Sequence, residues 1–241
     1  MAKGKRKIKK SVKICGLILL AIVVAVIVLL AIKPDDKFVY NEHLDDVVFT
    51  ISDMQSDAVI NVTLNDMTYY IEQIEDKVNQ MALKYNPNNP LEFWNVHYSA
   101  GMDSQFTSDI AKTMTEELCI YSCIMENEAK KKEIILDDNT VDSCKNEAVL
   151  IYQKLSNKVK EDTGISIESI IPLEERKELT RLYVASLLMS DNPLLNGVTL
   201  EDLDFEGTYY TSRIRSTYII DRNEELWDQI KLGRITINND K

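Results

Sequence analysis

The chain has 241 residues with 28 basic and 39 acidic side chains, so its formal net charge is −11. Residues 1–33 contain eight basic side chains and no acidic one, and the remainder therefore carries a net charge of −19. Such an acidic body repels nucleic acid, and we expect no nucleic-acid partner.

Near the N-terminus, residues 14–32 form an uncharged run of 19 residues, ICGLILLAIVVAVIVLLAI. As a helix this run would be about 28 Å long, close to the hydrocarbon thickness of a bilayer. Seven basic side chains lie in residues 1–13, so the positive-inside rule keeps that segment cytoplasmic. The sequence predicts a single-pass protein of the cell membrane, with its body on the extracytoplasmic side.

A cleaved signal peptide is the main alternative for this run. Such peptides usually have a shorter apolar region followed by a small-x-small cleavage site. Here the run is longer, and its exit reads LLAIKP. A lipoprotein anchor fits less well, because Cys15 precedes most of the run. We therefore expect an uncleaved signal anchor, with residues 33–46 as a tether.

Two short segments after the tether are typical of β-strands. Residues 47–51 read VVFTI and residues 58–62 read AVINV, and turn-forming residues lie between them. The pattern predicts a small hairpin.

The middle of the chain is predicted to be helical. Apolar side chains recur at helical spacing in four segments, each of which ends at a helix-breaking or polar stretch. The fourth helix is expected to begin near Pro172, because proline favours the first helical turn. The four patterns run over residues 67–85, 106–125, 141–159 and 179–187, and the third helix is expected to end at Gly164.

The last 49 residues change character. Residues 208–220 are rich in Tyr, Thr and Ile and predict a strand, residues 223–231 predict a short helix, and residues 234–237 predict another strand. Pairing with the early hairpin would give a small sheet. The expected fold is therefore mainly α: a membrane helix, a multi-helix domain over residues 47–192, and a β-prone tail over residues 193–241 that completes a β element.

Three cysteines follow the apolar run, at Cys119, Cys123 and Cys144. An odd number does not indicate a disulfide framework, and the simplest interpretation is three small buried side chains. An alternative stays open. If the helices on either side of residue 134 form an antiparallel hairpin, Cys123 and Cys144 come close enough to bridge in an oxidising compartment.

The sequence shows no catalytic signature. It has two histidines and seven glycines, without a phosphate-binding loop or a nucleophile elbow. The carboxylate pairs Glu116-Glu117 and Glu174-Glu175 are interpreted as solvated helix faces. We expect no catalytic residues, no metal site and no cofactor.

The most unusual local composition is PLEFWNVHY at residues 90–98, in a connection between two predicted helices. Its large aromatic side chains, Phe93 and Trp94, either close the core or form an apolar contact site for an unfolded polypeptide.

The order of these segments resembles a known family. The segments TLNDMTYYIEQIEDKVNQMALKYNPNNPLEFWN and ENEAKKKEIILDDNTVD follow a membrane segment and a short β element. This arrangement is similar to the N-terminal chaperone region of the SurA/PrsA-type foldases over residues 47–190. The resemblance implies a helical cradle that holds unfolded polypeptides. Taken together with the aromatic segment at residues 90–98, the resemblance implies these substrate-binding residues: Tyr69, Tyr70, Phe93, Trp94 and Tyr98.

The chain departs from that family after Pro193. A parvulin isomerase domain of ~90 residues often follows there, whereas this chain has about 50 more residues, with no histidine and three isolated glycines. The resemblance therefore implies a chaperone-like body without isomerase activity. The predicted function is the binding of unfolded or exported polypeptides at the outer face of the membrane. Two alternatives stay open: a cell-envelope assembly protein that docks one specific partner, and a degenerate prolyl isomerase.

Overall fold

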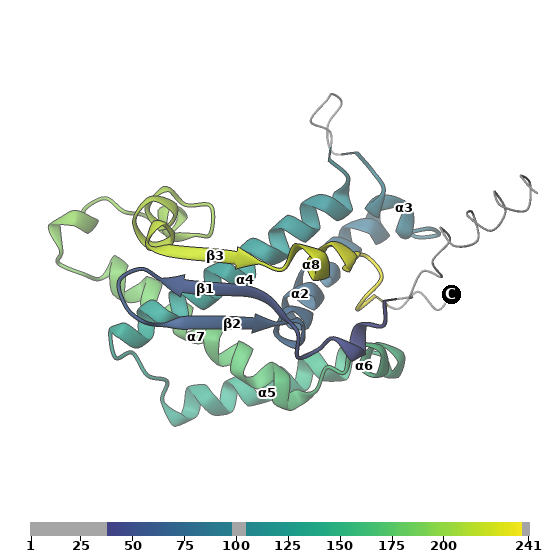
Figure 1. The fold of residues 1–241 in the computed structure, drawn as a ribbon, viewed down its shortest axis with the longest axis horizontal. Coiled ribbons are helices and arrows are strands. Elements are labelled where there is room, and N and C mark those ends of the chain that lie inside the picture. Colours follow the sequence, from purple (N-terminus) through teal and green to yellow (C-terminus); the bar gives the residue numbers. More distant parts are fainter. Residues whose placement is uncertain (1–37, 98–104, 238–241) are drawn as a thin grey trace, which may run out of the picture. The chain divides into compact units, whose positions relative to one another are not determined.

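The computed structural model describes residues 38–97 and 105–237 (Figure 1). The strands are β1 (Val47–Asp53), β2 (Val59–Thr63) and β3 (Tyr218–Arg222). The helices are α2 (Leu64–Tyr85), α3 (Leu91–Trp94), α4 (Thr107–Lys131), α5 (Asp138–Lys154), α6 (Asn157–Thr163), α7 (Ile167–Leu188) and α8 (Glu224–Gln229). Short 3₁₀ and π turns cover Tyr40–Glu42, Pro193–Leu195, Glu201–Leu203, Tyr210–Ile214 and Arg215–Thr217. The predicted mainly helical fold with a small sheet is confirmed for these residues.

The predicted membrane helix at residues 14–32 lies outside the described residues, as does the basic segment before it. Within residues 38–97 and 105–237, no helix has the length and apolar character needed to cross a bilayer.

The sheet has the order β2-β1-β3, and both pairings are antiparallel. Ile51, in the central strand, is opposite Ile60 on one side and Ile220 on the other. Val48, Phe49 and Ile51 are completely buried. The predicted hairpin and its pairing with the C-terminal tail are therefore confirmed.

Helix α2 begins directly after β2 because Thr63 and Asp66 form a reciprocal capping box. The helices then form a layer beneath the sheet, in which α7 packs against α2, α4 and α5 (Figure 1). The sheet and this layer are joined by an ion pair, since the ammonium of the exposed Lys131 lies 2.6 Å from the buried Asp53 carboxylate. Tyr218 of β3 also donates to Glu128 of α4 over 2.6 Å.

Two predicted helix boundaries differ from the structure. Helix α7 begins at Ile167 and not near Pro172, because the Ser166 side chain accepts from the Ser169 N–H and forms a capping box. The predicted third helix is divided into α5 and α6. Ser156 is extended and its hydroxyl caps the new helix, and Gly164 ends α6 with a left-handed φ of 64°.

The predicted strand at residues 208–220 is mostly wrong. Only Tyr218–Arg222 is extended, whereas the residues before it form irregular helical turns that bury Tyr210 and Ile214. The two side chains are four residues apart, so a helical turn places both on the face toward the core. The predicted strand at residues 234–237 is also wrong, because its N–H groups bond to a side chain and not to another strand.

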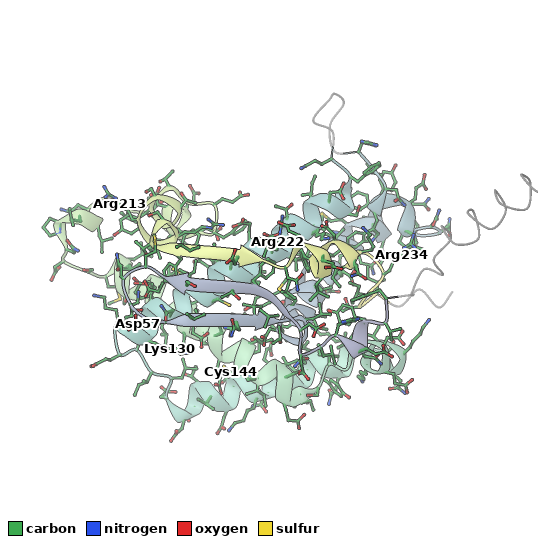
Figure 2. The ribbon with its side chains drawn as sticks, viewed as in Figure 1. Asp57, Lys130, Cys144, Arg213, Arg222 and Arg234 are labelled. Atoms are coloured by element: carbon green, nitrogen blue, oxygen red, sulfur yellow. The ribbon has the colours of Figure 1, made fainter. Side chains whose placement is uncertain are left out.

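The proposed bridge between Cys123 and Cys144 is not formed. All three described cysteines are free and buried. The helices on either side of residue 134 are α4 and α5, and they do not form the expected hairpin because α7 packs against both. Figure 2 shows Cys144 on α5.

Candidate functional site

The predicted substrate-binding residues do not form an open cleft in the part of the chain that the structure describes. Tyr69, Tyr70 and Trp94 are each at most 3% exposed, and Phe93 is half-buried against Tyr85, with ring centres 5.4 Å apart. Tyr98 lies outside the described residues. Whether these side chains ever contact a client stays a prediction, and contact by the three buried ones would require the structure to open.

Tyr69 and Tyr70 are core residues of the α2–α7 contact. The Tyr69 hydroxyl donates to the buried Glu174 carboxylate over 2.6 Å, and Arg176 lies 3.4 Å from the Tyr70 hydroxyl. Arg176 is also paired with Glu126 of α4 at 2.7 Å. These contacts fix α2, α4 and α7 against one another.

Next to Arg176, Cys119 and Cys123 lie one turn apart on α4 and are completely buried. Burial and its hydrogen bond to Cys123 raise the pKa of Cys119, while accepting that hydrogen bond lowers the pKa of Cys123. Reactive cysteines need access as well as thiolate character, so we interpret this pair as core packing. Within the described ranges, no group of three or more His, Cys, Asp or Glu side chains is arranged to hold a metal ion.

An apolar groove of about 420 Å³ lies between the C-terminal half of α7 and the connection that follows it. We call it the Leu200 groove. Its apolar lining comes from Tyr121, Val184, Ala185, Leu188, Leu200 and Leu203, and its polar lining from Lys177, Thr180, Arg181 and Asp204. Leu188 is 44% exposed and Leu200 is 65% exposed. Met189 and Leu194, which lie close to these residues in sequence, are more than four-fifths exposed.

Local hydrogen bonds hold Leu200 outward. Thr199 donates to the Asp202 carboxylate through its N–H and its hydroxyl, over 2.9 and 2.8 Å, and these bonds lower the pKa of Asp202. The following turn buries Leu203 completely, and the Tyr121 hydroxyl donates to the Leu203 carbonyl over 2.9 Å. With Leu203 anchored in the core, Leu200 three residues earlier stays accessible.

The charge around the Leu200 groove is mostly negative. The connection at residues 191–206 contains five acidic side chains and no basic one. The two basic side chains on the opposite wall already have partners, since Lys177 lies 3.0 Å from Glu174 and Arg181 lies 2.7 Å from Glu178. Of the five acidic residues, Asp204 lines the groove, so the groove combines an apolar floor with one carboxylate from an acidic connection.

Sequence reasoning missed this groove. Leu187, Leu188 and Met189 are consecutive at the end of a helix, and three consecutive side chains cannot all face one core. That excess of apolar side chains at a helix end was the available signal.

Comparisons of the chain with protein-family models, with characterised proteins and with solved structures find no match. The relation to the SurA/PrsA-type foldases stays a prediction from the order of the sequence motifs.

Proposed function

We propose that this protein binds unfolded or extended polypeptides in the Leu200 groove, acting as a chaperone-like protein without isomerase chemistry. In this proposal residues 14–32 hold the body at the extracytoplasmic face of the membrane, where exported chains emerge.

The observation that carries the proposal is the exposed apolar surface at Leu188 and Leu200. Contiguous exposed apolar patches on soluble domains usually mark contact sites. The two leucines lie with Val184 and Ala185 in one groove of about 420 Å³.

The acidic connection beside the groove defines the occupant more closely. Apolar segments flanked by Lys or Arg would place their apolar side chains on the floor and their charges beside residues 191–206. Opposite charge also accelerates association and discriminates against acidic segments. We therefore expect binding of basic-flanked apolar segments from many clients, with weaker binding of the same segments flanked by Glu.

The test measures peptide binding by fluorescence anisotropy, with the full-length chain in lipid nanodiscs and empty nanodiscs as the blank. Loss of the exposed Leu200 contact should remove about 1–2 kcal/mol, so Leu200→Ser should weaken binding of an apolar peptide with lysine flanks about tenfold. Ile135→Ser is the matched control, because Ile135 is 83% exposed and lies outside the groove.

Circular dichroism should show equal helix content for both variants, since both side chains are exposed. Unchanged binding by Leu200→Ser, or an equal loss in both variants, would contradict the proposal. Binding of one folded partner and of no extended peptide would favour the assembly-protein alternative.

A further inference from the structure

Residues 230–237, which follow α8, form a strap without regular secondary structure. Figure 2 labels Arg234 on this segment. Along its first part the side chains alternate, since Ile230 and Leu232 are buried whereas Lys231 is exposed. From residue 232 onward the strap follows a turn and then bends, with Gly233 in the left-handed region at a φ of 91°.

The strap is held by one carboxylate. Glu75 of α2 is completely buried, and all the hydrogen bonds that it receives in the described structure are donated by the strap. Its Oε1 accepts from the N–H groups of Gly233, Arg234 and Ile235, the last two at 3.1 and 3.3 Å. Its Oε2 accepts from the N–H and the hydroxyl of Thr236, both at 2.6 Å.

Four of the five donors are backbone N–H groups, and they converge on one carboxylate because the chain turns at Gly233. A carboxylate that recognises main-chain N–H groups does not select side chains. Burial raises the pKa of Glu75, although the five donors favour its charged form. Within the described structure no basic side chain pairs with Glu75. When the strap leaves, water can solvate the Glu75 carboxylate, and this hydration offsets part of the lost hydrogen bonding.

Selection comes instead from Trp94. Gly233 adopts a φ of +91° against the indole face, and a Cβ at that position would lie 2.7 Å from Trp94 Cδ2. The position therefore accepts glycine and rejects residues with a side chain. Trp94 itself is 3% exposed, and its indole N–H has no hydrogen-bond partner among the described residues.

The packing beside the strap is loose. A cavity of about 310 Å³ lies along residues 230–234 and is lined by Trp94, Asn95 and Lys112. A second cavity, of about 180 Å³, lies beside Thr236 and is lined by Glu72 and others. Both cavities are partly open to solvent, so a competing segment can reach the strap from either side of its anchor.

We propose that the surface under the strap is a second polypeptide-binding site, for a segment that turns at a glycine after two alternate apolar residues, and that the strap covers it until such a segment displaces it. This inference rests on the proposed function, since it names a second place where clients bind. The site under the strap would recognise backbone N–H groups and a glycine of the client, whereas the Leu200 groove would recognise apolar side chains.

The test uses the full-length chain and a synthetic peptide with the sequence of residues 228–237, DQIKLGRITI. Binding of the peptide should release the strap, so hydrogen exchange of the amides of residues 233–236 should accelerate at least fivefold. Core amides of α4 should not change. The matched peptide DQIKLARITI, with alanine in place of glycine, should bind at least tenfold more weakly because of Trp94.

Leu200→Ser should leave this exchange effect intact, which separates a failure here from a failure of the proposed function. In Glu75→Gln the strap amides should exchange at least tenfold faster even without peptide, because one acceptor oxygen is lost. The wild-type peptide experiment does not depend on whether that variant folds. An absence of accelerated exchange at millimolar peptide, or equal binding of both peptides, would overturn the inference.

Discussion

Glu72 gives the sharpest test of the electrostatics of the core. It lies on α2, is 7% exposed, and accepts a hydrogen bond from the Gln73 amide over 2.7 Å. Burial raises the pKa of Glu72 from the ordinary 4.5 to about 7, and the nearby Asp76 charge adds to this effect while Lys154 opposes it. Replacing Glu72 by Gln keeps the shape and removes the charge.

The magnitude follows from this shift. Each pKa unit corresponds to about 1.4 kcal/mol, so a rise to about 7 corresponds to about 3 kcal/mol when Glu72 is fully charged. The folded-state pKa is the higher one, so the unfolded state loses its proton first as pH rises. The protonated Glu72 therefore makes its full contribution to the free energy of unfolding below pH 4.5, and this contribution is lost as pH rises to about 7.

We expect Glu72→Gln to increase the free energy of unfolding by about 2–3 kcal/mol at pH 8.5 and by much less at pH 5. Urea titration followed by circular dichroism measures both values. Glu147→Gln, on the exposed side of α5, controls for the general loss of one negative charge. An effect of equal size at both pH values, or destabilisation at pH 8.5, would refute the reasoning.

Two further predictions concern stability. Trp94→Ala should lower the free energy of unfolding by about 3–5 kcal/mol, because Trp94 is a core side chain, and the half-buried Phe93→Ala should lower it by less; unchanged stability in urea would contradict this. Burial would raise the pKa of Asp53, but its bonds with Lys131 and Ser56 outweigh burial and lower it to about 2. Stability should therefore fall as pH drops from about 4 to 2, and thermal melts of Asp53→Asn should lack that part of the acid loss, worth about 2 kcal/mol.

Local sequence signals were sufficient for much of the fold. The hairpin followed from alternation and turn residues, and Gly164 marked a helix end because a left-handed cap favours glycine. Pro172 was misleading, because the capping box at Ser166 starts the helix earlier and leaves Pro172 inside it, as its sixth residue. Caps made by serine compete with the simpler proline signal.

The candidate sites were harder to predict because they depend on tertiary contacts. In sequence, Glu75 lies among other acidic residues and is indistinguishable from a solvated helix face. Its role appears only when the N–H groups of residues 233–236 approach it from 158 or more residues away. The same contact explains why residues 234–237 do not form the strand that their sequence pattern predicts.

The pairing of β1 with β3 has a consequence for how the chain acquires its structure. The partners are separated by about 170 residues, from Phe49 with Arg222 to Asp53 with Tyr218. Closing so long a loop is slow, and until residues 218–222 are available one edge of β1 is unpaired. During synthesis or export the hairpin therefore emerges long before its third strand, and for that interval it is itself open to pairing with other chains.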